Sequence, residues 1–154
     1  MVRIVLIHPQ IPPNTGNIAR TCAATATELH LVGPLGFELS DRYLKRAGLD
    51  YWPEVKLRYH GDLESFLDDW RRQSGDLIGF SARGDKNYLS YHFQTTDWLL
   101  FGSETEGLSQ EILDQCTQRL RIPMSGGAVR SLNLSVSVAV ALFEAYRQLD
   151  YFES

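Results

Sequence analysis

Three strand-length runs in this chain each end in a polar turn that contains glycine, and this recurrence limits the possible folds more than any other feature. The turns follow residues 2–7, 97–101 and 118–123. In a parallel sheet such turns lie at one edge, the carboxyl edge, where ligands commonly bind. Three turns from separate strand ends can therefore converge on a single crevice.

Strand-like and helix-like patterns alternate along the chain, which predicts an α/β fold with a parallel sheet. The β-branched run VRIVLI is typical of a buried strand, and GDLESFLDDWRRQ has the spacing of a core-packing amphipathic helix. In chain order, the expected elements are a strand over 2–7, a helix from Asn14 or Thr15 to about Ala26, a strand over 29–33, a short helix from Ser40 to Gly48, a helix over 61–73, strands over 76–81 and 97–101, a short helix over 109–116 and a strand over 118–123.

The C-terminal segment LSVSVAVAL has an ambiguous pattern. Its period-two alternation fits a strand, whereas the Ser131 and Asn133 side chains before it and FEAYRQL after it fit a long helix. We predict a helix, because Asn133 or Ser131 can accept hydrogen bonds from the free amides of a first turn. Gly126 and Gly127 precede this cap and would let backbone approach a ligand closely. The helix entrance is therefore a candidate ligand site.

The turn over residues 9–20, PQIPPNTGNIAR, carries a second set of candidates. Asn17 and Arg20 lie three apart, on one face of the expected helix. An arginine in this position can bind a phosphate, and a solvated surface residue is an equally good interpretation. His8, just before the turn, fits a strand end better than a catalyst.

The turn over residues 99–109, LLFGSETEGLS, carries the third set. Gly102 exposes backbone donors and acceptors, while Glu104 and Glu106 make the turn acidic and suited to a positively charged ligand. For Glu106 we favour another role, as a partner of the dipole of the following helix. The polar stretch 83–96 is long for a simple turn, and we expect it to cover a ligand or substrate.

Length and charge limit the class of protein. The 154 residues predict one domain over residues 1–154, and a net charge of −4 argues against coating nucleic acid by bulk electrostatics. The opening run MVRIVLIHP is too short for a signal or membrane segment, so we expect a soluble cytoplasmic protein with no membrane partner. Any RNA contact must be local, and the candidate basic groups are Arg42, Lys45 and Arg46, then Arg83 and Lys86, then Arg119, Arg121 and Arg130.

Several common chemistries lack their motifs. Cys22 and Cys116 are far apart and form no CxxC, which predicts buried reduced thiols and no structural metal. No GxGxxG follows a strand, and no GxxxxGK[ST], HExxH or GxSxG occurs. The usual dinucleotide, P-loop and hydrolase mechanisms are therefore disfavoured.

Taken together and in this order, PQIPPNTGNIAR, LLFGSETEGL and IPMSGGAVRSLNLSVSVAVALFEA closely resemble the SPOUT superfamily of RNA ribose methyltransferases. The resemblance extends from the first strand to the last helix and includes RAGLDYW at residues 46–52. The loop SGGAV at residues 125–129 is more glycine-rich than the pattern. The resemblance implies helices on both faces of a parallel sheet, with residues 99–140 threaded as a deep C-terminal trefoil knot.

The resemblance also implies a pocket for S-adenosylmethionine and no metal. The residues whose backbone would surround adenine and ribose are Phe80, Gly102, Ile122 and Met124. The residues that would complete the pocket are Ser131, Leu132 and Asn133. Such proteins act as homodimers through the first and last helices, which suits the apolar side chains Val136, Val138, Val140 and Phe143, although ordinary core packing suits each of them as well.

The implied reaction is methyl transfer to the ribose 2′-hydroxyl of the wobble nucleotide, cytidine or uridine, in tRNA of leucine isoacceptors. Arg20 matches the arginine of the family motif. Since guanidinium keeps its proton at ordinary pH, we expect Arg20 to anchor the adjacent phosphate and stabilise the developing alkoxide. Asn17, Glu104 or water would then guide the proton.

The implied RNA contact is the tRNA anticodon loop, whose bases can stack on aromatic side chains. The candidates are Tyr51, Trp52, Tyr88 and Tyr91.

Two alternative functions stay open: a knotted RNA-binding or assembly factor without catalysis, and a ribose methyltransferase acting on ribosomal RNA. The intact candidates Asn17, Arg20, Glu104, Ser131 and Asn133 argue against the first, and the short chain argues against the second.

Overall fold

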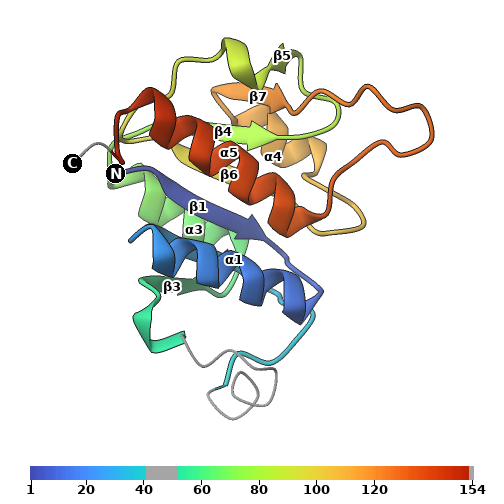
Figure 1. Cartoon of the computed structure of the whole chain (residues 1–154). Coiled ribbons are helices and arrows are strands. Elements are labelled where there is room, and N and C mark those ends of the chain that lie inside the picture. The colour runs from blue at the N-terminus through green and yellow to red at the C-terminus, as the bar shows by residue number, and fades with distance from the viewer. Residues whose placement is uncertain (41–51, 153–154) are drawn as a thin grey trace.

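A single parallel sheet of seven strands organises the molecule (Figure 1). The computed structural model describes residues 1–40 and 52–152. The strand order across the sheet is β3-β2-β1-β6-β4-β7-β5, and every paired neighbour is parallel. The strands are β1 (Arg3–Ile7), β2 (Glu28–Val32), β3 (Leu57–His60), β4 (Leu77–Phe80), β5 (Lys86–Asn87), β6 (Trp98–Phe101) and β7 (Gln118–Arg121).

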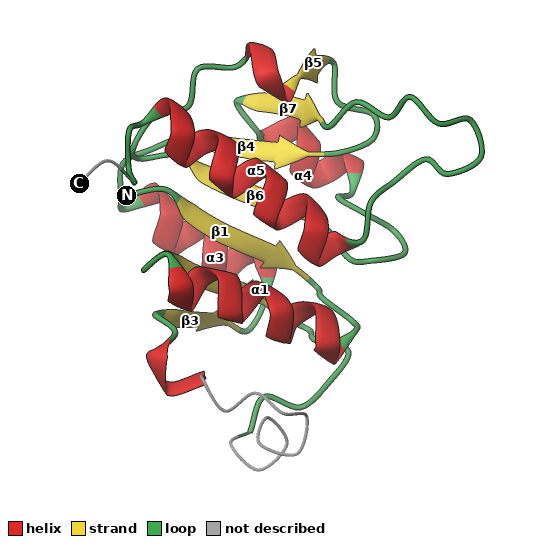
Figure 2. Cartoon of the chain, in the orientation of Figure 1, coloured by secondary structure: helices red, strands yellow, loops and turns green. Residues whose placement is uncertain are grey.

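Helices cover both faces of the sheet, as predicted (Figure 2). Helices α1 and α5 pack side by side on one face, and α3 and α4 cover the other. The helices are α1 (Pro12–Ala24), α3 (Leu63–Arg71), α4 (Gln110–Gln115) and α5 (Leu134–Gln148), with short 3₁₀ turns η1 (Trp52–Glu54) and η2 (Tyr88–Ser90). The expected helix from Ser40 to Gly48, with Arg42, Lys45 and Arg46, falls almost entirely outside the described residues, as does Tyr51.

The central strands read as continuous apolar runs because both of their faces are buried. Along β1, Ile4 and Leu6 join the core beneath α1 and α5, while Val5 and Ile7 join the core beneath α3 and α4. Successive side chains of a strand point to opposite faces, so one strand supplies both cores. The chain thus builds two apolar layers around one sheet.

The order of the strands reverses beside β6, which lies between β1 and β4. The connections from β1 lead one way along the sheet to β2 and β3, and β4, β7 and β5 lie on the other side. Leu6 pairs in register with Phe101, so the turns that follow β1 and β6 leave the sheet next to each other. Such a reversal is where open α/β sheets bind ligands.

The first helix begins earlier than predicted. Its first residue is Pro12, and the preceding Ile11 makes no side-chain capping bond, so the prediction of a start capped by Asn14 or Thr15 is wrong. Proline suits the first helical position because its φ is already helical and its missing amide would have no partner there. The side chain of Asn14 is consequently available for other contacts.

Two strands escaped prediction. The edge strand β3 has the sequence LRYH, which is too polar and too exposed to resemble the buried runs. Strand β5 contains only two residues and lies within the polar stretch 83–96, where its partner is β7. Edge strands have weak hydrophobic patterns in the sequence, because they are defined by pairing with a neighbouring strand and their side chains are not fully buried.

The C-terminal segment is helical, as predicted. The Asn133 side chain caps α5 by accepting a hydrogen bond from the Ser135 backbone amide at 2.9 Å. The alternating apolar residues divide between core and surface. Val138 is fully buried, so of the two roles left open for it the structure selects core packing, whereas Val136 is 46% exposed and Phe143 is 48% exposed. A helix turns by about 100° per residue, which spreads a period-two pattern around its axis.

Candidate functional site

A pocket of about 300 Å³ lies beyond the carboxyl ends of β4, β6 and β7. Its walls come from the ends of these strands, the turn after β6, and the long loop before α5. Seven of the predicted site residues line it: Phe80, Gly102, Glu104, Ile122, Met124, Ser131 and Leu132. Two of the three predicted turns, those after β6 and β7, therefore meet in one cavity, whereas no residue of the first turn lines it.

Two aromatic rings form a flat apolar wall of the pocket. Phe80 ends β4 and Phe101 ends β6, and their rings stack with centroids 4.8 Å apart and planes 10° apart. Both side chains are buried. A wall of this kind suits the planar or apolar part of a ligand, while the neighbouring backbone supplies hydrogen-bonding groups.

The turn after β6 folds tightly onto itself. The Gly107 amide donates a hydrogen bond to the Ser103 carbonyl at 3.0 Å, and Gly107 has a φ of +68°. A Cβ atom added to Gly102 would lie 1.9 Å from the Gly107 carbonyl carbon. Glycine is therefore required at position 102, because the backbone of Gly107 occupies the space of a side chain.

Glu104 joins this turn to the start of α1. Its carboxylate accepts hydrogen bonds from the backbone amides of Gln10 at 2.9 Å and Ile11 at 2.7 Å. The Asn14 side-chain amide also donates to it, at 3.3 Å. A carboxylate at a helix N-terminus satisfies free amides and complements the helix dipole. These contacts indicate that Glu104 holds the start of α1 in place, and they disfavour a role for Glu104 as a free proton acceptor.

Asn14 extends this connection to the last helix. Its side-chain oxygen accepts a hydrogen bond from the Asn133 side-chain amide at 3.0 Å. Asn133 in turn accepts from the Ser135 hydroxyl at 2.6 Å. The three sequence motifs are therefore connected by one chain of side-chain hydrogen bonds, from Glu104 through Asn14 to Asn133.

Asn14 is a site residue that the sequence patterns did not single out. Its position before a helical run predicted only a cap, which is a local role. The side chain is instead 7% exposed and bonds to residues 90 and 119 positions away. The sequence carried no signal for these contacts, because they depend on the pairing of β1 with β6.

Asn17 and Arg20 lie apart from the pocket lining. Both are exposed on α1, three residues apart as predicted. The cations that do line the pocket are Arg83 and Arg130. Arg83 also donates to the Leu108 carbonyl at 3.3 Å. The pocket is thus lined by these two arginines and by Glu104 and Glu106, whereas Asn17 and Arg20 belong to a separate, exposed helical face.

Two of the aromatic candidates for RNA stacking, Tyr88 and Tyr91, have packing roles. The Tyr91 hydroxyl donates to the Asp97 carboxylate at 2.9 Å, and burial raises the pKa of Tyr91. Tyr88 packs partly buried against the core beneath α1 and α5. Trp52 lies in η1. Tyr88 and Tyr91 pack the 83–96 segment against the core, and its strand β5 pairs with β7. Of this segment, which we expected to cover a ligand, Arg83 lines the pocket.

The two cysteines are buried thiols, as predicted. Neither is in a disulfide, and burial raises the pKa of Cys22 to about 12 and that of Cys116 to about 11. A protonated thiol is a weak nucleophile and a weak metal ligand.

Among the helices that the structure describes, none is long and apolar enough to cross a membrane.

The whole chain is similar to RNA methyltransferases. A Synechocystis protein is 66% identical over 149 residues, covering 97% of each chain. The Yersinia pestis tRNA (cytidine(34)-2′-O)-methyltransferase is 46% identical, covering 98% of this chain and 96% of its own.

Solved structures of RNA methyltransferases are also similar to this chain. One that concerns 2-OH methylation of C/U34 on tRNA is 51% identical with a TM-score of 0.88, covering 97% of this chain and 91% of the other. The SpoU methyltransferase AviRb from Streptomyces viridochromogenes, in complex with AdoMet, is 27% identical with a TM-score of 0.83. In that match 97% of this chain is covered and 58% of AviRb. The profile of the SpoU rRNA Methylase family matches residues 1–143, and the chain therefore belongs to this family.

Proposed function

We propose that this chain is a tRNA methyltransferase that methylates the ribose 2′-hydroxyl of the wobble nucleotide, cytidine or uridine 34. The observation that carries the proposal is the meeting of the three motifs, two lining one pocket and the third bonded to Glu104. The relatives that share nearly the whole chain give the substrate class, since the Yersinia pestis enzyme is named for cytidine 34 of tRNA.

The methyl donor in this proposal is S-adenosylmethionine, held in the pocket. The residues present fit it: the Phe80 and Phe101 wall suits an adenine ring, and the turn from Gly102 to Gly107 lines the pocket beside this wall. Backbone of Gly102, Ile122 and Met124 would bind adenine and ribose, and Ser131, Leu132 and Asn133 would complete the site. The bound donor supplies a methyl group on a positively charged sulfur. The AviRb complex with AdoMet supports this assignment.

Positioning of the hydroxyl is the main task left to the protein. A well-oriented nucleophile can gain about 7–11 kcal/mol from proximity alone. Arg20 would bind the neighbouring phosphate and stabilise the developing alkoxide, because guanidinium is a permanent donor. Asn17 or water would guide the departing proton. Glu104 contributes by fixing the start of the helix that carries Asn17 and Arg20.

A homodimer would complete the RNA site. Exposed apolar side chains lie on α5 and next to the ends of α1 and α5: Ile11 at 41%, Val136 at 46%, Phe143 at 48% and Phe152 at 50%. Burying exposed apolar side chains stabilises association. Arg20 and Asn17, exposed on α1, would then lie near the partner's pocket, and the anticodon loop would contact both subunits.

The trefoil knot also belongs to this proposal, over residues 99–140. It is supported by the resemblance of the three motifs to the SPOUT superfamily, together with the placement of β6 between β1 and β4. Pulling one molecule by its two ends tests it. A knotted chain would extend to less than its contour length, whereas full extension would contradict the knot.

Methyl transfer from labelled S-adenosylmethionine to unmodified tRNA tests the proposed reaction. Mass spectrometry of the nucleosides and fragments should locate one 2′-O-methyl group at position 34, and separate isoacceptors should show whether leucine tRNAs are preferred. A parallel reaction with ribosomal RNA is the control, because the family profile is described for rRNA. Methylation of that RNA alone would overturn the tRNA assignment. Cofactor binding without transfer to either RNA would favour a non-catalytic binding factor.

A further inference from the structure

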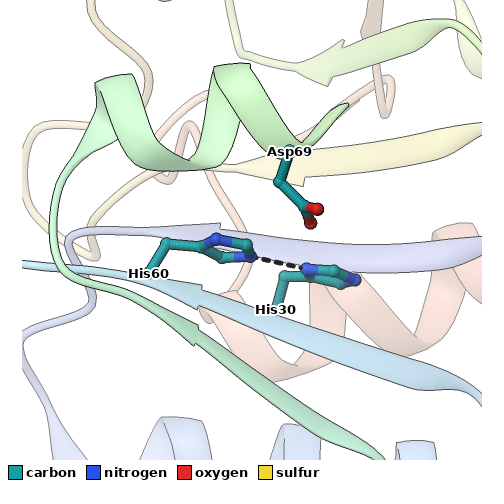
Figure 3. Close-up of side chains that lie close together, drawn as sticks. All are labelled: His30, His60 and Asp69. Carbon is teal, nitrogen blue, oxygen red and sulfur yellow. Dashed lines mark hydrogen bonds between the residues drawn. The ribbon is translucent and has the colours of Figure 1, made fainter. Parts of the chain in front are cut away.

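Two histidines and an aspartate lie together at the β2–β3 side of the sheet, away from the methyl-transfer pocket (Figure 3). His30 comes from the middle of β2, His60 ends β3, and Asp69 lies on α3 above them. His30 is 1% exposed. The pocket lies at the ends of β4, β6 and β7, and the proposed methyl transfer makes no use of this cluster.

Hydrogen bonds set the orientation of the His30 ring. Its Nε2 lies 2.5 Å from a carboxylate oxygen of Glu28, which can only accept, so Nε2 carries the proton. The opposite nitrogen, Nδ1, is then left with a lone pair. This atom is 2.8 Å from Nε2 of His60, as the dashed line in Figure 3 marks.

The surrounding side chains hold both rings in place. The His30 and His60 rings stack with centroids 5.1 Å apart, and Phe66 packs edge-on against each of them. Trp98 lies 4.9 Å from the His30 ring. The Asp69 carboxylate points down from α3 toward the two rings (Figure 3), and one potential ligand atom from each of the three residues lies within 4.8 Å of the others.

We propose that His30 Nδ1, His60 Nε2 and a carboxylate oxygen of Asp69 bind a divalent transition-metal ion of the zinc class. Two imidazoles and one carboxylate favour such an ion over magnesium or calcium, which prefer oxygen ligands. Glu28 would act as the outer carboxylate that commonly fixes a metal-binding histidine through its other nitrogen. Water would take the fourth position.

Small adjustments would suffice to form the site. Zinc ligands lie about 2.0–2.2 Å from the ion, so the half-buried Asp69 side chain would move toward the rings. His60 would shift its proton from Nε2 to Nδ1, with no proton lost overall. The ion would tie the sheet edge to α3.

Metal titration of the untagged protein tests the site. After treatment with a chelator, zinc binding is measured by calorimetry, and cobalt binding by its visible absorption, which reports nitrogen and oxygen coordination. We expect one ion per chain and a higher melting temperature with zinc. His60→Ala and Asp69→Asn should each weaken zinc binding by roughly tenfold or more. Both positions are partly exposed, so these variants should fold, which circular dichroism would verify.

His92→Ala is the matched control, because His92 is exposed and outside the cluster. It should bind zinc as the unaltered protein does. The alternative is a hydrogen-bonded histidine pair that serves only packing. Failure to bind zinc, no effect of zinc on the melting temperature, or equal zinc binding by His60→Ala and the unaltered protein would establish that alternative and overturn the metal site. Methyl transfer is measured separately, so failure of the metal site would leave the proposed reaction intact.

Discussion

At the scale of single residues, Glu104 has the most consequential contacts, because it joins the turn after β6 to the first turn of α1. Glu104→Gln leaves one accepting oxygen and removes the charge. Hydrogen bonds to charged groups contribute about 1.5–3 kcal/mol, so we expect the free energy of unfolding to fall by about 1–3 kcal/mol. Methyl transfer should fall roughly tenfold or more, since α1 would no longer be positioned.

Urea denaturation and initial rates of methyl transfer measure the two effects of Glu104→Gln. Glu111→Gln is the control, because it removes the same charge from an exposed side chain that does not line the pocket. Equal losses in both variants would show that the net charge matters and that the bonds to α1 do not.

At the scale of an element, the turn from Gly102 to Gly107 determines the shape of the pocket. In Gly102→Ala the new Cβ would lie 1.9 Å from the Gly107 carbonyl carbon, so the turn must open. Overpacking of this kind costs about 1–3 kcal/mol, sometimes more, and we expect S-adenosylmethionine binding to weaken roughly tenfold or more. Calorimetric binding and urea denaturation measure both effects.

Gly126→Ala is the matched control for the turn, because a Cβ added there meets nothing within 4 Å. Its stability should match that of the unaltered protein. If Gly102→Ala also left stability and cofactor binding unchanged, the close approach of Gly102 to Gly107 would have no role in the pocket.

At the scale of the whole molecule, the exposed face of α1 and α5 should determine the oligomeric state. Phe143→Glu places a charge where Phe143 stacks on Phe152, with ring centroids 5.1 Å apart. A buried charge without a partner opposes association, so the dimer should weaken roughly tenfold or more. Sedimentation velocity measures this change. Methyl transfer should fall with it, since the RNA site would be shared.

Tyr59→Glu is the control for the dimer, because Tyr59 is an equally exposed aromatic, at 52%, on the edge strand β3. It should leave sedimentation unchanged. A Phe143→Glu variant that still sedimented as a dimer would require another interface.

The sequence by itself determined those features of the protein that depend on neighbouring residues. Buried strands such as β1 and β6 were predictable because both of their faces lie against helices, and α5 was predictable because Asn133 caps it. The three motifs predicted the family, and their resemblance to it predicted seven of the residues that line the pocket. These signals are local, and each needs only a few consecutive side chains.

Only the tertiary structure decided which distant residues meet. Asn14 bonds to Glu104 and Asn133 because the strand order places β6 beside β1, and a sequence pattern does not contain that order. His30 and His60 are brought together because β2 pairs with β3, an edge strand too polar to be recognised. Long-range pairing is set by burial and hydrogen bonding of the whole sheet, and this is why local periodicity could not predict it.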